Sequence, residues 1–269
     1  MAKIFQIDAF TDHLFGGNPA AVVPLESWLD DKILQAVAME NNLAETAFIV
    51  PVGDAYELRW FTPVSEVALC GHATLATAYV LIHHLGVTAK EIKFITRQFG
   101  TLSVKLLESG KLAMSFPSIP VDESADIDLV AAALASRPVT LYCGYYSADE
   151  FDYMAVFETA EQIAALRPDN SAFAALSSRG VIASASAVNQ DCDFVSRYFA
   201  PVFGIDEDPV TGSAHCLLAP YWAEVLGKEH LVANQISSRG GKLECTVEPA
   251  ATVLTGSCVD YLQGEIKLS

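Results

Sequence analysis

Two short glycine turns carry residue types that could do chemistry, and each turn precedes a largely apolar stretch. They read Cys70-Gly-His-Ala-Thr74 and Thr211-Gly-Ser-Ala-His215. If Gly71 and Gly212 each begin a helix, the first backbone N–H groups of both helices lack partners and lie at the positive end of the helix dipole. Such groups bind a carboxylate or stabilise an enolate-like oxygen. The alternative is that both are ordinary turns leading into buried helices.

The two turns belong to a longer internal repeat. Arg59-Trp-Phe-Thr-Pro63 is similar to Arg197-Tyr-Phe-Ala-Pro201, 138 residues later, and the glycine turns follow 141 residues apart. We expect the second spacing to continue, so that Gly100 matches Gly241. Only two copies occur, which predicts a duplicated unit and not a solenoid. Two copies related by a pseudo-twofold axis make a cleft, a favoured place for a small-molecule site.

Hydrophobic patterning predicts the elements that must position these turns. Alternating segments predict strands at Lys3–Phe10, Ala47–Pro51, Tyr56–Phe61, Glu91–Thr96, Thr101–Leu107, Gln235–Ser238 and Lys242–Val247. Helical periodicity predicts helices at Leu25–Met39, with Leu29, Ile33 and Val37 on one face, near Gly71–His84 and near Gly212–Leu226. A capping-box spacing at Thr159-Ala-Glu-Gln162 predicts one more helix start.

A helix that is apolar on all sides has to be enclosed, and the surrounding strands can enclose it. We therefore predict an α+β fold of two pseudo-symmetric domains, each a curved, mostly antiparallel sheet wrapped around a central helix. The prolines of Ser115–Pro120 mark a linker. The N-terminal half is expected at residues 1–116, with a strand returning at about 259–269, and the C-terminal half at 117–258, with the active site in the cleft between them.

Composition excludes several classes of partner. The chain has 269 residues and a formal net charge of −17, which argues against nucleic acid and against anionic membranes. Residues 67–89 carry no charge, but we interpret them as a loop and a buried helix because they contain three histidines and many alanines. The charged N-terminus and the six cysteines without a CxxC pair predict free thiols, a cytoplasmic location and no metal site.

Five motifs occur in order along nearly the whole chain: Gly17-Asn-Pro-Ala-Ala-Val22, Glu45-Thr-Ala47, Phe61-Thr-Pro63, Cys70-Gly-His-Ala-Thr74 and Asp208-Pro-Val-Thr-Gly-Ser-Ala214. Together they resemble the PhzF family of phenazine-biosynthesis isomerases and their relatives. The resemblance implies the diaminopimelate epimerase fold. It also implies an isomerase in which a glutamate moves a proton on a small cyclic amino acid, with no metal or organic cofactor.

The resemblance also assigns roles to residues of this chain. Glu45 takes the role of the acid and base, and His72 and Asp208 orient and hydrogen-bond the substrate. We expect the helix dipole to keep His72 neutral. The substrate-binding groups that it implies are Asn18, Gly71, Gly212 and Ser213. The same residues have simpler interpretations from the sequence alone, namely Asn18 and Asp208 as turn residues and Ser213 as a helix cap.

Two other functions stay open. Related racemases and epimerases use two facing cysteines, but this chain has Cys70 at the first position and Thr211 at the second, and a hydroxyl is a poor substitute for a thiol. Cys70 alone remains a candidate base for a dehydratase, or a small buried residue. The chain could also bind a metabolite without turning it over. We expect Arg59 and Arg197 to be structural anchors, a small carboxylate as the substrate, and a homodimer as a possible assembly.

Overall fold

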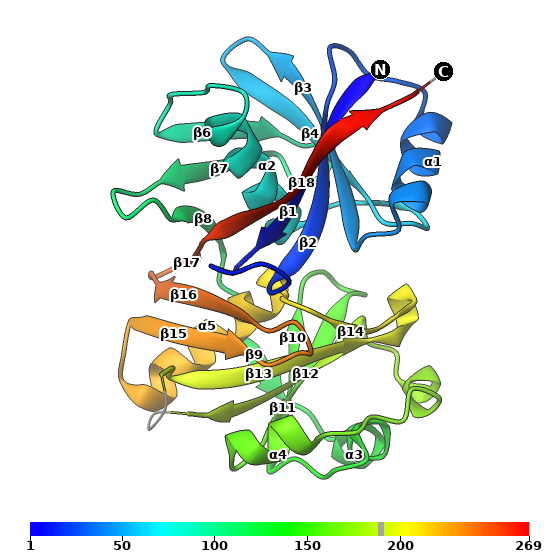
Figure 1. The fold of residues 1–269 in the computed structure, drawn as a ribbon. Helices are drawn as coiled ribbons and strands as arrows, with labels where there is room; N and C mark the ends of the chain where they lie inside the picture. The colour runs from blue at the N-terminus through cyan, green and yellow to red at the C-terminus, as the bar shows by residue number, and fades with distance from the viewer. Residues whose placement is uncertain (188–190, 269) are drawn as a thin grey trace. The chain divides into compact units, whose positions relative to one another are not determined.

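The computed structural model describes residues 1–187 and 191–268 and divides into two compact units. Unit 1 comprises Met1–Ser115 with Thr255–Ser269, and unit 2 comprises Phe116–Leu254 (Figure 1). The predicted linker Ser115–Pro120 contains the first boundary, but its first three residues belong to a strand. Residue 269, the last of the predicted returning segment, lies outside the described residues.

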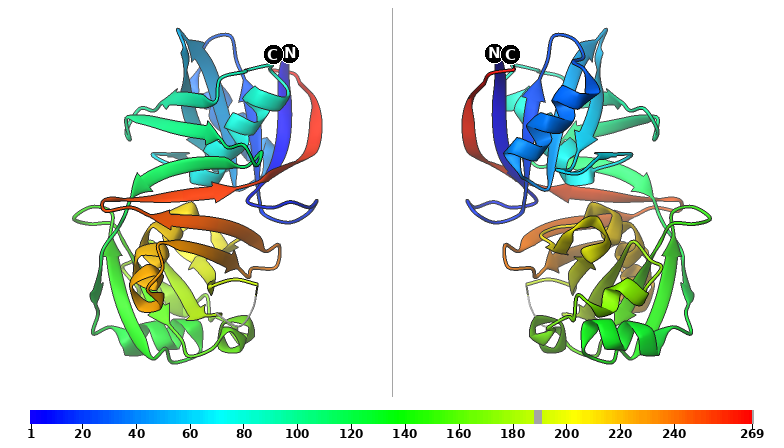
Figure 2. Two further views of the ribbon diagram at one scale, coloured as in Figure 1. Left: turned by 90° about the vertical axis from the view of Figure 1, so that its left-hand side faces the viewer. Right: turned by 90° about the vertical axis from the view of Figure 1, so that its right-hand side faces the viewer.

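Unit 1 contains a mixed sheet in the order β18-β1-β2-β3-β4-β6-β7-β8. Neighbouring strands are antiparallel except for the parallel pairs β2–β3 and β4–β6. The short strand β5 adds to β4. The bounds are β1 (Ala2–Ala9), β2 (Asn18–Pro24), β3 (Glu45–Val52), β4 (Ala55–Phe61), β5 (Glu66–Val67), β6 (Glu91–Ile95), β7 (Thr101–Leu106), β8 (Leu112–Pro117) and β18 (Cys258–Ile266). The predicted return of the C-terminal segment is confirmed, because β18 pairs with β1, and Figure 2 shows the two chain ends side by side.

The sheet of unit 1 curves around helix α2 (Gly71–His83). This helix contacts β1, β2, β3, β7 and β18, which come from both ends of the strand order. Its residues from His72 to Ala78 are all buried, as expected for a helix that is apolar on every side. The prediction of a loop and a buried helix within residues 67–89 is confirmed. Within the described ranges, no helix combines the length and apolar character needed to cross a membrane.

Helix α1 (Asp31–Asn41) packs on the other face of the sheet, where it contacts β3 and β4. The predicted start at Leu25 is wrong, because Asp30 caps the helix by accepting a hydrogen bond from the backbone N–H of Lys32 at 2.8 Å. The predicted face is only partly right, because Leu29 and Val37 pack against the buried cluster but Ile33 does not. Leu34 and Ala38 are buried, whereas Ile33 is exposed.

Unit 2 has the same organisation, with the sheet order β9-β10-β11-β12-β13-β15-β16. Its parallel pairs are β11–β12 and β13–β15, and the short strand β14 adds to β13. The bounds are β9 (Val121–Glu123), β10 (Thr140–Tyr145), β11 (Phe151–Val156), β12 (Gly180–Ser186), β13 (Phe194–Ala200), β14 (Ile205–Asp208), β15 (His230–Gln235), β16 (Gly241–Val247) and β17 (Ala251–Gly256). Helix α5 (Gly212–Leu226) contacts β11, β12, β15 and β16 and takes the place of α2.

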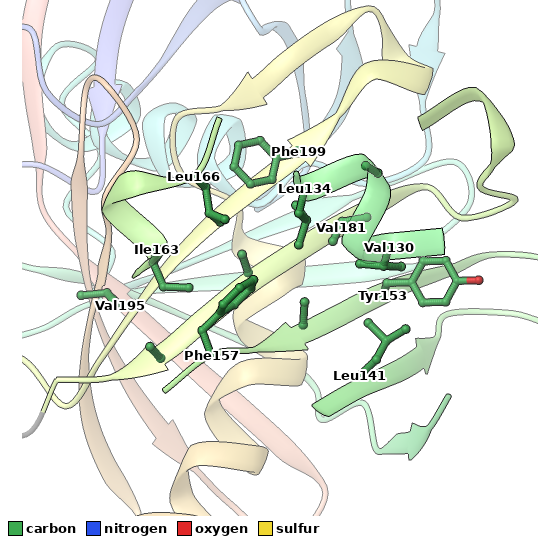
Figure 3. Packing of buried hydrophobic residues seen from close by; sticks show 14 of the residues in the cluster. Val130, Leu134, Leu141, Tyr153, Phe157, Ile163, Leu166, Val181, Val195 and Phe199 are labelled. Carbon is green, nitrogen blue, oxygen red and sulfur yellow. The ribbon is translucent and has the colours of Figure 1, made fainter. Parts of the chain in front are cut away.

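Outer helices cover the second face of this sheet. They are α3 (Ile127–Leu134) and α4 (Ala160–Ala165), with 3₁₀ turns at Ala172–Ala175 and Pro201–Phe203. Their apolar side chains form a buried cluster with the sheet, and Figure 3 shows Val130, Leu134 and Ile163 pointing into it. The predicted capping box is confirmed, because the side chains of Thr159 and Gln162 each accept a hydrogen bond from the other residue's backbone N–H.

The two units therefore repeat one arrangement of strands around a central helix, which confirms the predicted α+β class. The spacing between the copies does not stay at 141 residues. Gly100 (φ 84°) and Gly240 (φ 66°) occupy the same position in equivalent turns, so the match of Gly100 to Gly241 is wrong by one residue. The strand predicted at Gln235–Ser238 is misplaced accordingly, and β15 ends at Gln235. The slip arises beyond the helix start, because the connection from the central helix to the next strand is shorter in unit 2, at residues 227–229 against 84–90, and this outweighs the greater length of α5.

Arg59 and Arg197 make the same bidentate contact in both units, which confirms their prediction as structural anchors. Nε and Nη2 of Arg59 donate to the two carboxylate oxygens of Glu66 at 2.7 Å each. Nε and Nη2 of Arg197 donate to Glu207 at 2.7 and 2.8 Å. Each glutamate lies on the short strand that precedes a glycine turn, so each ion pair fixes the path of the chain into the central helix.

We expect Arg59→Met to lower the free energy of unfolding of unit 1 by about 2 kcal/mol, because Glu66 on β5 loses its bidentate partner. The Arg59 side chain is only 2% exposed, but Glu66 is 26% exposed and keeps part of its hydration. Urea unfolding followed by tryptophan fluorescence measures the change. Arg97→Met is the matched control, since Arg97 approaches the same Glu66 from an exposed position and should change stability by less than about 0.5 kcal/mol. Equal effects of the two substitutions would contradict the anchor role.

Candidate active site

The structure brings Glu45 and His72 together at the start of a strand and the start of a helix. Glu45 is the first residue of β3, and His72 is the second residue of α2. The chain reaches β3 through Asn42, which ends α1 in the left-handed conformation at φ 50°. The Asn41 side chain then donates to Thr46 Oγ1 at 3.0 Å and ties the helix end to the strand start. As a result, Glu45 Oε2 lies 3.1 Å from His72 Nε2.

The Glu45 carboxylate is enclosed but not fully satisfied. Its side chain is 18% exposed, and the Oε2 atom is buried. Although the imidazole nitrogen is close, the geometry does not make a hydrogen bond, and Oε2 has no hydrogen-bond partner among the described residues. A buried acceptor left in this state costs about 1–3 kcal/mol. Such a cost is common where a group is kept for a ligand or for chemistry.

Cys70 completes a compact group with these two residues. It is the N-cap of α2, and its Sγ lies 3.5 Å from His72 Nδ1. Burial and the nearby charge of Glu45 together raise the pKa of the Cys70 thiol to about 11. Cys70 is therefore a neutral thiol at neutral pH. It lies beside the imidazole and does not act as a preformed thiolate.

The charge of His72 differs from the prediction. Burial disfavours the imidazolium, but the Cys70 sulfur and the Glu45 carboxylate beside the ring favour it, and the pKa of His72 is raised well above its usual value. The expectation of a neutral His72 is wrong because it considered only the dipole of α2. It did not include the two acidic groups that pack against the ring.

Asn18 lies at the same edge of the sheet as Glu45. It is the first residue of β2 and is fully buried. Ala20 pairs with Glu45 across the parallel strands β2 and β3, so the Asn18 side chain, two residues before Ala20, points to the same face as the Glu45 side chain. The turn before it requires glycine, since Gly17 has φ 64° and a Cβ there would lie 2.2 Å from the carbonyl oxygen of Ala9.

In unit 2 the matching turn is held by its own hydrogen bonds. Asp208 ends β14 and accepts a hydrogen bond from the Thr211 hydroxyl. Gln235 clamps the turn, because its Oε1 accepts from Thr211 N at 2.9 Å and its Nε2 donates to the carbonyl oxygen of Asp208 at 2.8 Å. Sequence analysis missed Gln235, and the only signal was a polar residue at the end of an apolar strand.

Ser213 is the second residue of α5 and is half-buried. The N-cap is Thr211, so the interpretation of Ser213 as the helix cap is wrong. Gly71 and Gly212 are both the first residues of their helices, as predicted. The structure therefore presents the first-turn N–H groups of one helix in each unit.

Thr211 occupies the position of Cys70, as predicted, because each residue is the N-cap of the central helix of its unit. The carbonyl oxygen of each N-cap accepts a hydrogen bond from the side chain four residues later in the sequence. The donor to Cys70 is Thr74 Oγ1 at 2.6 Å, and the donor to Thr211 is His215 Nδ1 at 2.8 Å. Since a carbonyl only accepts, His215 Nδ1 carries a hydrogen. Burial lowers the pKa of His215 to about 4, so its ring is neutral.

Unit 2 has no acid at the position of Glu45. In unit 1, Ala20 of β2 pairs with Glu45 of β3. The equivalent pair in unit 2 is Asp152 of β11 with Gly180 of β12, so Gly180 stands where unit 1 has the glutamate. A Cβ on Gly180 would lie 2.7 Å from Tyr198 Oη, and Asp152 accepts the Tyr198 hydroxyl at 3.0 Å. The space used by the carboxylate in unit 1 is thus filled by a buried tyrosine–aspartate contact. The repeat found in the sequence did not extend to this strand, so this difference was not foreseen.

The predicted site residues thus form two groups. Unit 1 holds Asn18, Glu45 and His72 at the start of α2, and unit 2 holds Asp208 and Ser213 at the start of α5. The meeting of these two groups in one site stays a prediction. The catalytic and binding roles of the individual residues also stay predictions.

Comparisons with known proteins agree on one family. The family described as phenazine biosynthesis-like protein matches residues 7–264. An uncharacterised isomerase of Pseudomonas aeruginosa is 49% identical over 98% of both chains. The crystal structure of a phenazine biosynthesis protein of the PhzF family from Enterococcus faecalis is 41% identical, covers 99% of both chains and has a TM-score of 0.93. A probable proline racemase from Agrobacterium radiobacter shares the fold alone, with 11% identity, coverage of 100% of this chain and 94% of the other, and a TM-score of 0.63.

The buried His215 gives a prediction about pH. Its pKa is about 4 in the folded protein and about 6.5 in the unfolded chain, so the unfolded chain binds more protons between these values and stability rises with pH across this range. We expect the free energy of unfolding of the wild type, relative to His215→Asn, to rise by about 3 kcal/mol from pH 4 to pH 6.5 and to be flat above about pH 7. Urea unfolding at several pH values measures it. A difference that does not change with pH would contradict the neutral buried ring.

Proposed function

The chain belongs to the phenazine biosynthesis-like protein family, and we propose from this premise that it is an isomerase that moves a proton on a small, amino-acid-like carboxylate. In this proposal Glu45 is the general acid and base, and the proton transfer needs no cofactor. A cytoplasmic location and a homodimer remain part of the same proposal.

The observation that carries this proposal is the state of the Glu45 carboxylate. Its Oε2 is buried, lies 3.1 Å from His72 Nε2 and has no hydrogen bond from a described residue. A purely structural carboxylate would be expected to use its acceptors in hydrogen bonds or to be hydrated. A buried carboxylate oxygen that lies beside an imidazole but makes no hydrogen bond is instead suited to accept a proton from a carbon acid.

The proposed reaction needs one proton and one acid–base group. The Glu45 carboxylate removes a proton from one carbon of the substrate, the double-bond electrons shift, and the resulting carboxylic acid returns the proton to another carbon on the same face. His72 contacts the carboxylate and supports its negative charge before the transfer. General acid–base catalysis by one group supplies roughly 10²–10⁴-fold, and positioning of the substrate supplies more.

Negative charge that develops on the substrate needs donors. The first-turn N–H groups of α2, starting at Gly71, lie at the same helix start as His72. Within the helix, the first backbone N–H to donate to the carbonyl oxygen of the N-cap Cys70 is that of Thr74, at 3.2 Å. These groups can hold a carboxylate or an enolate-like oxygen. We propose that Asp208, Gly212 and Ser213 of unit 2 and Asn18 of unit 1 complete the substrate contacts.

A second candidate function rests on the contact between Cys70 and His72. A thiol 3.5 Å from an imidazole nitrogen is an arrangement that can act as a base in a dehydratase or an epimerase. Two observations weigh against it. Burial holds the pKa of Cys70 at about 11, and Thr211 replaces the second thiol of a two-base mechanism. A protein that only binds a metabolite is the third possibility.

Solvent deuterium uptake tests the proposal. A panel of small cyclic and acyclic amino acids is incubated with the protein in D₂O, and incorporation is measured by mass spectrometry. For any compound that exchanges, we expect Glu45→Gln to slow exchange by at least about 10²-fold, since the amide cannot accept the proton. Binding of the same compound, measured by calorimetry, should change little.

Two controls separate the alternatives. Glu40→Gln, an exposed position on α1, should leave exchange at the wild-type rate. Cys70→Ser should slow exchange by less than about tenfold if Glu45 is the base, and a loss as large as that of Glu45→Gln would favour the Cys70 reaction instead. Binding without exchange in the wild type would favour the non-catalytic function.

A further inference from the structure

We infer that Glu45, Cys70 and His72 form a binding site for a single zinc-like transition-metal ion, and that this ion blocks the carboxylate when it binds. One ligand atom from each residue lies within 4.8 Å of the other two. The three residues supply an oxygen, a sulfur and a nitrogen, which are the ligands that Zn²⁺ uses in proteins.

The separations of these atoms are close to those of a tetrahedral site. A zinc ion bonds to sulfur at about 2.3 Å and to nitrogen or oxygen at about 2.0–2.2 Å, which places neighbouring ligand atoms roughly 3.3–3.6 Å apart. The observed separations are 3.1 Å from Glu45 Oε2 to His72 Nε2 and 4.0 Å from His72 Nε2 to Cys70 Sγ. The ligand atoms of Glu45 and Cys70 lie within 4.8 Å of each other.

The charges of the site also suit a divalent ion. A Cys70 thiolate and a Glu45 carboxylate together carry two negative charges, which neutralise the two positive charges of the metal. A bound metal ion itself favours the deprotonated thiol and the neutral imidazole that coordinate it, so binding releases protons. Outside this group, no set of three or more histidine, cysteine or acidic side chains in the described residues is placed to hold an ion in this way.

The ligand set selects the kind of metal. A thiolate and an imidazole favour Zn²⁺, Co²⁺ and similar transition metals over Mg²⁺ and Ca²⁺, which prefer oxygen ligands. Three protein ligands leave a fourth position for water or for a substrate oxygen. The metal would also satisfy Glu45 Oε2, the buried oxygen that otherwise has no hydrogen bond.

Metal binding has a consequence for the reaction that rests on the proposed function. An ion bonded to Glu45 Oε2 and His72 Nε2 withholds the carboxylate from the substrate carbon. Zinc is therefore expected to inhibit proton exchange reversibly. The site itself does not depend on this consequence, because metal binding is measured without a substrate.

Cobalt titration of the purified metal-free protein tests the site directly. We expect one equivalent of Co²⁺ to produce a thiolate-to-cobalt charge-transfer absorption together with visible bands of a tetrahedral ion, and Zn²⁺ to displace them. Cys70→Ser keeps the shape of the side chain and should abolish the charge-transfer absorption and weaken Zn²⁺ binding by about 100-fold or more. Cys258→Ala is the control, because this half-buried cysteine of unit 1 is not part of the group.

The outcomes separate the two proposals. Absence of a charge-transfer absorption in the wild type, or its survival in Cys70→Ser, would overturn the metal site. If Cys70→Ser does not fold, Glu45→Gln provides the second test, because it should keep the thiolate absorption and weaken binding, whereas unchanged affinity would overturn the three-ligand site. A metal that binds as described without inhibiting deuterium exchange would support the site and contradict the role of Glu45 as the base.

Discussion

The contact between Glu45 and His72 is the interaction on which the candidate site depends. Its origin is a packing requirement, since an apolar helix such as α2 must be enclosed by the sheet around it. Enclosing the body of the helix leaves its N-terminal turn as the place where polar groups meet. The end of α1, the start of β3 and the start of α2 converge there. The carboxylate, imidazole and thiol are thus brought together by elements that are buried for other reasons.

Duplication has kept the scaffold and changed the residues at this place. The bidentate Arg–Glu pairs are the same in both units, and the carbonyl oxygen of each N-cap accepts a side-chain hydrogen bond, from Thr74 in unit 1 and from His215 in unit 2. At the positions of the candidate site the two units differ, with Thr211 in place of Cys70 and Gly180 in place of Glu45. The scaffold contacts stabilise either unit. The residues that differ are the ones that contribute chemical groups, so only unit 1 retains an acid at this strand start.

The sequence predicted what depends on local patterns. The bounds of α5, the capping box at Thr159 and the two arginine anchors follow from hydrophobic runs, fixed spacings and the repeat. Prediction from the sequence failed where a helix cap or a contact between distant residues determines the structure. Asp30 starts α1 later than periodicity suggests, and Gln235 clamps a turn from another strand. The charge of His72 depends on neighbours brought together by folding, which periodicity cannot reveal.

The most direct test of the account is whether Glu45 carries the same hydrogen from one carbon to another. With a substrate identified by exchange, deuterium placed at the donor carbon is followed in a single turnover in ordinary water. The account predicts that part of this deuterium appears at the receiving carbon of the product, and that Glu45→Gln forms almost no product. Product formation by Glu45→Gln at the wild-type rate would contradict it.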